Sequence, residues 1–277
     1  MSQSSPVVVI TGASRGAGRA VALAFGAAGA TVVAAGRSTR GQTTENLPGT
    51  IDETAEAIVR AGGRALAVRC DVTLAADVDA LFERVDAELG GPDVLVSNAW
   101  GGYEGHDGAG FVRAFWEQDH ERRWRGMFEA GLSGHLRTAA RAARSFVQKK
   151  QGLIIATVAW DRGHYLGALH YDVAKAAIVR SIAGMARELR PHGVHAVAVA
   201  PGFMRTERVL QAHEAAPFDL SRTESPVYLA RALVALASAD DRARFSGEVV
   251  PAAEIARAYG VTDEDGTQPP PFTLDEP

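Results

Sequence analysis

Six short apolar runs recur along this chain, and they limit its possible folds more than any other feature. They are Val7 to Ile10, Thr31 to Ala35, Ala65 to Val68, Val94 to Val96, Leu153 to Val158 and Val194 to Val199. Each run is nearly continuous in apolar residues, as expected for parallel strands that helices cover on both faces. Segments with helical periodicity separate the runs. We therefore predict an α/β fold built on a doubly wound parallel sheet.

The length and the C-terminal composition predict one domain with a short extension. A chain of 277 residues can form a single large α/β domain, which we place at residues 1–262. Residues 263–277 contain Pro269-Pro270-Pro271 and five acidic residues, so we expect an extended tail. Two interpretations of the tail stay open. It is a solvated terminus, or it packs across a subunit boundary and covers Phe272 and Leu274.

One helix and one loop can be placed from local patterns. Thr50-Ile51-Asp52-Glu53 has the spacing of a capping box, and an apolar stripe follows it at Ile51, Ala55, Ile58 and Val59. This pattern predicts a helix that covers the second and third strands. The polar segment Ser38 to Gly49 is longer than most strand-to-helix connections, so we expect a surface loop there.

Charge and cysteine content exclude several classes of protein. Acidic residues outnumber basic ones, 33 against 29, and the basic residues are spread along the chain, so we expect no nucleic-acid or anionic-membrane partner. Cys70 is the single cysteine, which excludes an intramolecular disulfide. The N-terminal residues lack the features of a signal peptide, and no apolar run approaches the roughly 18 to 20 residues of a membrane span. A cytoplasmic protein is expected.

A glycine-rich segment, Thr11 to Gly18, follows the first predicted strand and opens a predicted helix. In this context glycines let the backbone approach a pyrophosphate at a helix N-terminus. Such a turn also serves elsewhere as a plain helix cap, so the prediction depends on the motifs described below. The candidate cofactor-binding residues of the turn are Gly12, Ser14, Arg15, Gly16, Ala17 and Gly18.

The residues after the second predicted strand indicate the type of dinucleotide. The chain reads Ala35-Gly36-Arg37-Ser38 and lacks the Asp or Glu that would hold a ribose diol. Arg37, together with Arg15, can form charge-assisted bonds to a 2′-phosphate, and no carboxylate is present to repel it. We therefore predict NADP(H) as the cofactor. The alternative for Arg37 is a solvated loop charge.

A tyrosine and a lysine, Tyr171 and Lys175, are spaced one helical turn apart. The unperturbed pKa of a phenol is about 10, and an ammonium four residues away would stabilise the anion and lower that pKa. Reduction of a carbonyl by a nicotinamide requires such a positioned acid. We predict Tyr171 as the acid and Lys175 as its catalytic partner.

Five short motifs occur in order along nearly the whole chain. They are TGASRGAGRA from Thr11, Cys70-Asp71-Val72, Ser97-Asn98-Ala99, YDVAK from Tyr171, and Pro201 to Thr206. Together they resemble the short-chain dehydrogenase/reductase family, whose fold is the Rossmann fold. Three further segments resemble the branch of human dehydrogenase/reductase member 1 and its bacterial relatives. These are Asn98-Ala99-Trp100, Gly131 to His135, and Ala256 to Gly260.

The resemblance implies further contacts with the cofactor and a mode of assembly. The implied contacts are Asp71 and Val72 on adenine, Asn98 and Ala99 near the adjoining ribose, Lys175 on the nicotinamide ribose, and Pro201, Gly202 and Thr206 on the carboxamide side. Related enzymes pair through long helices, which here correspond to about Glu121 to Lys149 and Tyr171 to Arg190. A homodimer or homotetramer is therefore expected.

Two positions depart from the family pattern at the catalytic site. The serine that binds the substrate oxygen is replaced by Val158, which cannot donate a hydrogen bond, and the helix asparagine of the proton relay is replaced by Gly131. Thr157 can replace the serine only if a bulge turns its side chain inward. Asp161 and His164 lie in the following loop, and Asp161 is interpreted as a loop-capping residue because a carboxylate would repel an alkoxide.

The remaining candidates concern the substrate. Five apolar or aromatic side chains are expected to wall an apolar pocket, unless they are ordinary core or surface residues: Trp100, Trp160, Tyr165, Phe203 and Met204. The histidines have no metal-ligand spacing with carboxylates, and no nucleophile-elbow pattern precedes a helix, so we expect neither a metal site nor a serine hydrolase.

Two functional hypotheses follow. The first is an NADP(H)-dependent short-chain oxidoreductase that interconverts a carbonyl and an alcohol on a small, largely apolar substrate through Tyr171 and Lys175. The alternative is an NADP(H)-binding protein of the same fold with little or no turnover, which acts as a regulatory or interaction module. The departures at Val158 and Gly131 motivate this alternative.

Overall fold

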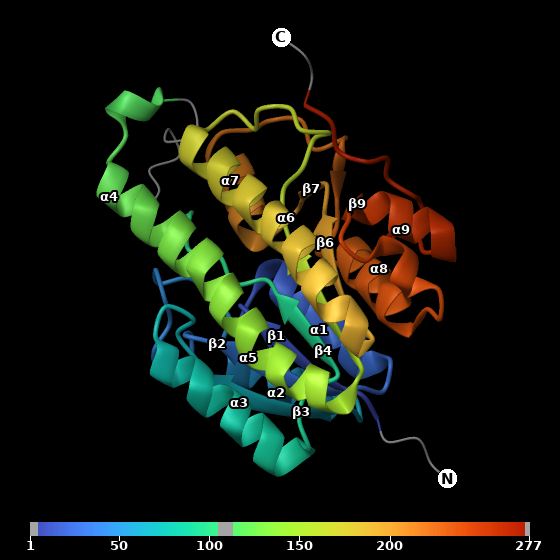
Figure 1. Ribbon diagram of the computed structural model, residues 1–277. Helices are drawn as coiled ribbons and strands as arrows, with labels where there is room; N and C mark the ends of the chain where they lie inside the picture. The colour runs from blue at the N-terminus through green and yellow to red at the C-terminus, as the bar shows by residue number, and fades with distance from the viewer. Residues whose placement is uncertain (1–4, 105–112, 275–277) are drawn as a thin grey trace.

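A parallel sheet forms the centre of the computed structural model, which describes residues 5–104 and 113–274 (Figure 1). The strand order is β3-β2-β1-β4-β5-β6-β9, and every neighbouring pair is parallel. The strands are β1 (Val7–Thr11), β2 (Thr31–Gly36), β3 (Arg64–Arg69), β4 (Val94–Ser97), β5 (Gly152–Thr157), β6 (Val194–Ala200) and β9 (Val249–Pro251). The predicted doubly wound sheet is confirmed, and its order reverses between β1 and β4.

The sequence analysis missed the edge strand β9 and a small second sheet. β9 has three residues, too few to give an apolar run of recognisable length. The second sheet pairs β7 (Phe203–Met204) with β8 (Thr223–Glu224). The predicted strand Leu153 to Val158 extends one residue too far at its C-terminal end. β5 ends at Thr157, so Val158 lies just beyond the strand.

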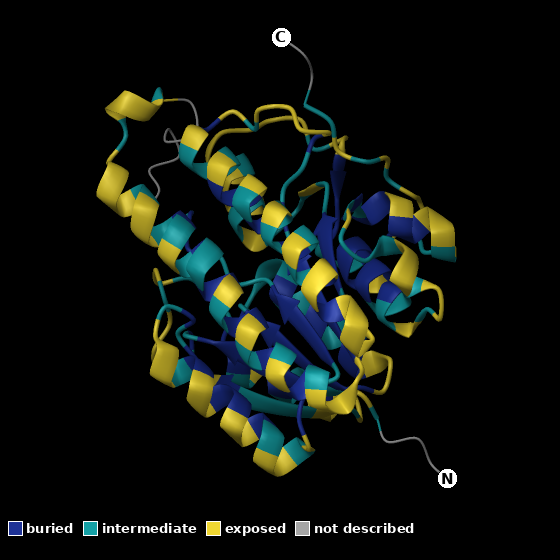
Figure 2. Ribbon diagram, viewed as in Figure 1, coloured by how far each residue is buried: buried dark blue, intermediate teal, exposed yellow. Residues whose placement is uncertain are grey.

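Helices cover both faces of the sheet, and each face has its own apolar cluster (Figures 1 and 2). One face carries α1 (Gly16–Ala27), α2 (Ile51–Arg60), α8 (Pro226–Ser238) and α9 (Ala252–Tyr259). The other carries α3 (Ala75–Leu89), α5 (Gly134–Lys149) and α6 (Leu169–Leu189). Val8 belongs to the first cluster and Val9 to the second, because successive side chains of a strand point to opposite faces.

The capping box of α2 is present and fixes this helix to the glycine-rich turn. The Glu53 N–H donates to Thr50 Oγ1 (3.1 Å), and the Thr50 N–H donates to Glu53 Oε2 (2.9 Å). Thr54 Oγ1 donates to the Ala13 carbonyl at 2.9 Å, which ties the helix to the turn. The predicted apolar stripe is wrong at Val59, whose side chain is 55% exposed.

A long helical rod crosses the second face and changes its winding in the middle. It begins as α4 (His120–Arg123), continues as the π-helical segment η3 (Trp124–Ser133) and ends as α5. Gly131 lies inside the π-helical segment, where the wider turn alters backbone hydrogen bonding. The remaining short helices are η2 (Phe115–Glu117), η4 (Arg190–His192), α7 (Glu207–Ala215) and η5 (Arg242–Phe245).

The C-terminal segment, as far as residue 274, is extended and packs on its own chain. Asp263 is buried and accepts a hydrogen bond from the Ser225 N–H (2.9 Å). The Leu274 N–H donates to Asp161 Oδ2 at 2.8 Å, so the segment reaches the loop that follows β5. Phe272 is still 36% exposed. Across residues 5–104 and 113–274, every helix is too short or too polar to span a bilayer.

Candidate active site

The glycine-rich turn joins β1 to α1 at the carboxyl edge of the sheet, and its glycines are required by close contacts. A Cβ at Gly18 would lie 2.1 Å from the Gly12 carbonyl oxygen, and a Cβ at Gly12 would lie 2.9 Å from Ala99 Cα. Gly12 and Gly16 also have φ values of +70° and +53°, which favour glycine. Around them Ser14 is buried and Ala17 packs against the core. Residues with side chains therefore do not fit at Gly12 and Gly18 without a shift of the turn.

Asn98 ties the ends of three strands together beside this turn. Its Nδ2 donates to the Thr11 and Gly12 carbonyls at 3.3 and 3.4 Å, and its Oδ1 accepts a hydrogen bond from Thr157 Oγ1 at 3.2 Å. The N–H groups of Asn98 and Ala99 both donate to Thr11 Oγ1, at 3.0 and 3.1 Å. Asn98 and Ala99 thus hold the edge where β1, β4 and β5 end.

An anionic oxygen already binds the start of α1. The Gly16 N–H donates to Glu207 Oε2 at 3.0 Å. Glu207 follows Thr206, which caps α7, and the Thr206 side chain lies beside Gly16. A helix N-terminus attracts negative charge, so this carboxylate stands in for a phosphate oxygen. The residues of the turn therefore fit the pyrophosphate of a dinucleotide.

The segment after β6 is supported by a carboxyl group that the sequence analysis missed. Glu224 accepts a hydrogen bond from the Gly202 N–H, and a Cβ at Gly202 would lie 2.6 Å from Glu224 Oε2. Burial raises the pKa of Glu224 to about 7. Pro201 and Gly202 are thus placed by the β7–β8 sheet. Nothing in the spacing of Glu224 along the chain marks it.

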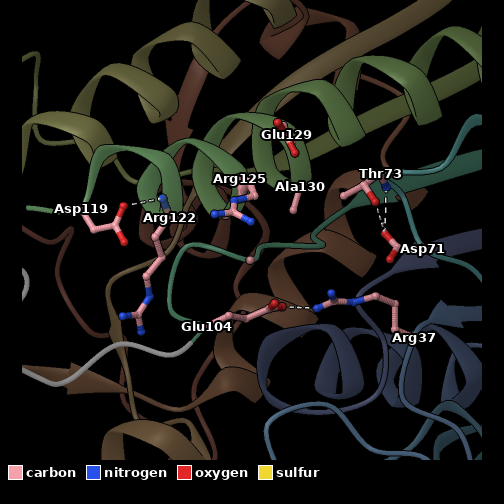
Figure 3. A pocket seen from close by; sticks show the side chains of 11 residues that line it. Arg37, Asp71, Thr73, Glu104, Asp119, Arg122, Arg125, Glu129 and Ala130 are labelled. Carbon is pink, nitrogen blue, oxygen red and sulfur yellow. Dashed lines mark hydrogen bonds and ion pairs between the residues drawn. The ribbon is translucent and has the colours of Figure 1, made fainter.

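Arg37 and Asp71 line one cavity of about 410 Å³, and both side chains are labelled in Figure 3. Arg15 is not among the lining residues. Arg37 is ion-paired with Glu104 across this cavity. The other lining residues are Thr73, Gly101, Asp119, Arg122, Arg125, Gly126, Glu129 and Ala130. Arg15 instead donates to Thr44, Ser38 and the carbonyls of Leu47, Pro48 and Gly49, so it organises the loop between β2 and α2. Val72 packs against Gly134.

Tyr171 and Lys175 lie on the first turns of α6. The Lys175 ammonium is 5.6 Å from the centroid of the Tyr171 ring, and burial lowers the pKa of Lys175 to about 7. Burial, followed by the neighbouring Tyr103, raises the pKa of Tyr171 above its ordinary value. The residues around Tyr171 therefore shift its pKa in the direction opposite to the one expected from Lys175. They keep the phenol protonated, as an acid requires.

Comparison with known proteins agrees with this geometry. The family model described as short chain dehydrogenase matches residues 6–216. The chain belongs to this family. It is 37% identical to mouse and 36% identical to human Dehydrogenase/reductase SDR family member 1, over 94% of this chain and 83% of each relative. A short-chain type dehydrogenase/reductase from Mycobacterium marinum is 31% identical, covers 89% of this chain and 93% of its own, and superposes with a TM-score of 0.74.

In this short-chain dehydrogenase, Trp100 occupies the space beside Lys175. Its ring lies 3.7 Å from the Lys175 ammonium, and no hydrogen-bond or carboxylate partner of that ammonium is present among residues 5–104 and 113–274. Cβ atoms at Gly131 and Gly102 would lie 2.5 Å from Trp100 Cζ3 and 2.7 Å from its Cε2. The two glycines make room for the indole. The absence of a side chain at position 131 is therefore matched by the large ring at position 100.

Tyr103 is a residue of this site that the sequence analysis missed. Its hydroxyl donates to the Tyr171 hydroxyl at 3.4 Å, and the two ring centroids are 6.3 Å apart. Trp100 makes edge contacts with both rings, at 6.3 Å to Tyr103 and 5.6 Å to Tyr171. Tyr103 is separated from Tyr171 by 68 residues, so only the fold brings the two phenols together.

The residues at and near position 158, where the family has a serine hydroxyl, make other contacts. Val158 is 4% exposed and belongs to the apolar cluster against which Trp100 packs. Thr157 donates to Asn98, as described above. Asp161 is buried and holds Leu274, and His164 Nδ1 lies 3.5 Å from its carboxylate, which agrees with a loop-capping role.

The expected apolar wall is only partly assembled. Trp160 packs against the core cluster of α5 and α6, and Met204 packs against the other cluster. Tyr165 and Phe203 are 56% and 41% exposed. None of these four side chains lines the cavity at Arg37. Within the described residues, no group of three His, Cys, Asp or Glu side chains could hold a metal ion.

Proposed function

We propose that this short-chain dehydrogenase is an NADP(H)-dependent oxidoreductase that interconverts a carbonyl and an alcohol on a small, largely apolar molecule. The observation that carries the proposal is the position of Tyr171 and Lys175 on α6, beside Trp100, which packs against an apolar cluster. A protonated phenol and a buried lysine in this arrangement can deliver a proton to an oxygen.

The proposed roles divide the site into a binding part and a proton-transfer part. The bound dinucleotide supplies a hydride. The N–H groups of the glycine-rich turn bind its pyrophosphate, and Thr206, Pro201 and Gly202 hold the carboxamide side. Asp71 and Val72 bind adenine, and Asn98 with Ala99 keeps the ribose region in place. Tyr171 transfers its proton to the substrate oxygen, and Lys175 binds the ribose and then favours the phenolate.

The preference for NADP(H) rests on Arg37, because the end of β2 has no carboxylate to bind a ribose diol. Arg37 faces the cavity that Asp71 also lines, while Arg15 supports the adjoining loop. We expect NADPH to bind at least about tenfold more tightly than NADH, or about 1.4 kcal/mol, in a fluorescence titration. Arg37→Asp should narrow or reverse the difference. Equal affinities in the parent protein would contradict the preference.

A turnover screen tests the activity itself. Aldehydes, ketones and quinones are offered with NADPH, and each is repeated with Tyr171→Phe. Removal of the acid should lower kcat/KM by about 10² to 10⁴ and leave the Kd of NADPH unchanged. The second candidate function, a cofactor-binding module of low turnover, is favoured by the apolar side chain at Val158. It predicts NADPH binding without turnover of any carbonyl.

We also propose a mode of assembly from the same family likeness, and a location from the single cysteine. We expect a homodimer or homotetramer to form through two surfaces. One is the helical rod of α4, η3 and α5, and the other is α6. A monomer in light scattering at micromolar concentration would contradict this. The cytoplasm is the proposed location.

A further inference from the structure

The developing charge of a carbonyl reduction needs more than one donor. As hydride reaches the carbonyl carbon, negative charge collects on the oxygen, and each preorganised donor aimed at that oxygen lowers the barrier. Tyr171 supplies one such donor. The apolar Val158 supplies none, and the Thr157 hydroxyl donates to Asn98.

We propose that the hydroxyl of Tyr103 is the second donor to the substrate oxygen, and that Tyr103 is a catalytic residue of this enzyme. The proposal rests on the proposed oxidoreductase function. The Tyr103 hydroxyl donates to the Tyr171 hydroxyl over 3.4 Å, a long hydrogen bond that a better acceptor such as a substrate oxygen can replace. An oxygen placed between them can lie about 2.8 Å from both, the usual distance for O–H···O bonds. The pair therefore forms a cradle for a single oxygen atom.

Contacts on both sides fix the position of Tyr103. The Trp100 ring lies edge-on against Tyr103 and Tyr171, and this sets the orientation of both phenols. Arg208 Nη1, from α7, donates to the Tyr103 carbonyl at 3.1 Å. The next residue, Glu104, is ion-paired with Arg37 at the end of β2. A donor held in this way does not have to reorganise during the reaction.

The charge state of Tyr103 suits a donor that keeps its proton. Burial raises the pKa of Tyr103, so its hydroxyl stays protonated at neutral pH. In the step itself the carbonyl carbon accepts a hydride from the reduced nicotinamide, and the carbonyl π electrons move to oxygen. The oxygen takes the proton of Tyr171, while the O–H bond of Tyr103 stays intact. The products are the alcohol, the oxidised nicotinamide and the Tyr171 phenolate, which solvent reprotonates.

Tyr103→Phe tests the proposal with the loss of one oxygen atom. We expect kcat/KM for the carbonyl that the parent reduces best to fall by about 10² to 10³, mostly through kcat, because the bond strengthens in the transition state. The Kd of NADPH, measured by fluorescence, should change less than twofold. Tyr259→Phe is the matched control, since its hydroxyl binds Asp241 at the distant end of α9. That variant should retain the parent rate.

A second substitution, Val158→Ser, tests whether the lower rate of Tyr103→Phe comes from the loss of a hydrogen-bond donor. In the Tyr103→Phe background, Val158→Ser restores a hydroxyl at the position where the family resemblance places the serine that binds the substrate oxygen, and it should raise kcat/KM at least about tenfold. In the parent background the same serine should give less than threefold, because the oxygen already has two donors. A gain of tenfold or more in the parent, with no loss in Tyr103→Phe, would overturn the proposal and show that the site lacks a second donor.

The outcomes separate this inference from the proposed function. Turnover in the parent that disappears in Tyr171→Phe but is unchanged in Tyr103→Phe would overturn the role of Tyr103 and leave the oxidoreductase standing. A parent that binds NADPH and reduces no carbonyl would overturn both. If Tyr103→Phe unfolds, Arg208→Gln, which removes the charged contact to the Tyr103 carbonyl, should lower kcat in the same direction by about threefold to tenfold. An unchanged kcat there would count against the proposal.

Discussion

The proposed cofactor half and the proposed catalytic half of this site differ in how closely their residues match the family pattern. The proposed cofactor half consists of the glycine-rich turn, Asn98 and Thr206, the residues that the family resemblance assigns to the cofactor. The proposed catalytic half consists of Trp100, Tyr103, Gly131, Val158 and the pair Tyr171 and Lys175, and two of these, Gly131 and Val158, depart from the pattern that the family resemblance implies. Both halves lie at the same edge of one sheet. The difference between them is therefore chemical and not a difference of fold.

Backbone geometry explains why the first half tolerates so little change. Gly18 packs directly against a backbone carbonyl, so no other residue fits without moving the turn. The second half depends on the volume of side chains and on a few donors. Trp100 can fill the space left by Gly131, and the phenol of Tyr103 can approach Tyr171 from another loop. Side-chain functions can thus be exchanged between positions, whereas the positions of backbone N–H groups cannot.

The largest expected effect comes from Gly18→Ala in the cofactor half. Its Cβ would lie 2.1 Å from the Gly12 carbonyl oxygen, so the turn has to open. We expect the Kd of NADPH to rise at least about 100-fold and the free energy of unfolding to fall by about 3 kcal/mol, measured by fluorescence titration and urea denaturation. Gly184→Ala on α6 is the control, because a Cβ there meets no atom within 4 Å. Equal results for the two variants would remove the contrast between the halves.

The second prediction concerns the buried charge of the catalytic half. Burial lowers the pKa of Lys175 from 10.5 to about 7, so between these values the unfolded chain binds more protons than the folded one. The destabilising free energy of the buried Lys175 charge is therefore at its full value below about pH 7. As the pH rises above this value, the destabilisation falls by about 1.4 kcal/mol per pH unit. From pH 7 to 9 the parent should gain about 2 kcal/mol over Lys175→Met in urea denaturation. Parallel pH curves would contradict the buried charge.

The third prediction concerns the contact between the Trp100 indole and the Lys175 ammonium in the proposed catalytic half. The indole face stabilises the ammonium of Lys175, so its loss in Trp100→Leu should lower the pKa of Lys175 by about one unit, or 1.4 kcal/mol. The chain has three lysines, Lys149, Lys150 and Lys175, so ¹³C-lysine NMR reads this pKa directly. Trp100→Phe keeps an aromatic face and should retain most of the stabilisation. An unchanged pKa in Trp100→Leu would mean that the indole only fills space.

The smallest expected effect returns to the cofactor half. The Glu207 carboxylate binds the Gly16 N–H, where a phosphate oxygen of the cofactor is expected, so the two compete. Glu207→Gln should tighten NADPH binding by about threefold, or roughly 0.7 kcal/mol. Glu214→Gln, an exposed carboxylate on the same helix, is the control for charge alone. A similar gain in both variants would indicate a general electrostatic effect and no competition at Gly16.

Local sequence patterns are enough to predict the sheet and the glycine-rich turn. Continuous apolar runs can be buried only between two layers of helices, and the turn from Gly12 to Gly18 combines a strand end with a helix start, so both are local patterns. The sequence also identified Tyr171 and Lys175, because one helical turn places them on the same face. The sequence analysis missed β9, whose three residues give no period, and it wrongly included the exposed Val59 in an apolar stripe.

The contacts between side chains in the proposed catalytic half could not be predicted from the sequence, because they depend on the packing of distant segments. Tyr103 and Glu224 lie on a loop and a short strand whose sequences carry no period or motif, and Trp100 was predicted only as a pocket wall and not as a neighbour of Lys175. Their contacts with Tyr171, Gly202 and Lys175 join segments far apart in the chain. The direction of the pKa shift of Tyr171 was also inaccessible, because burial outweighs a charge four residues away. Local spacing fixes neighbours on one element, whereas burial and contacts between loops depend on how all the elements pack.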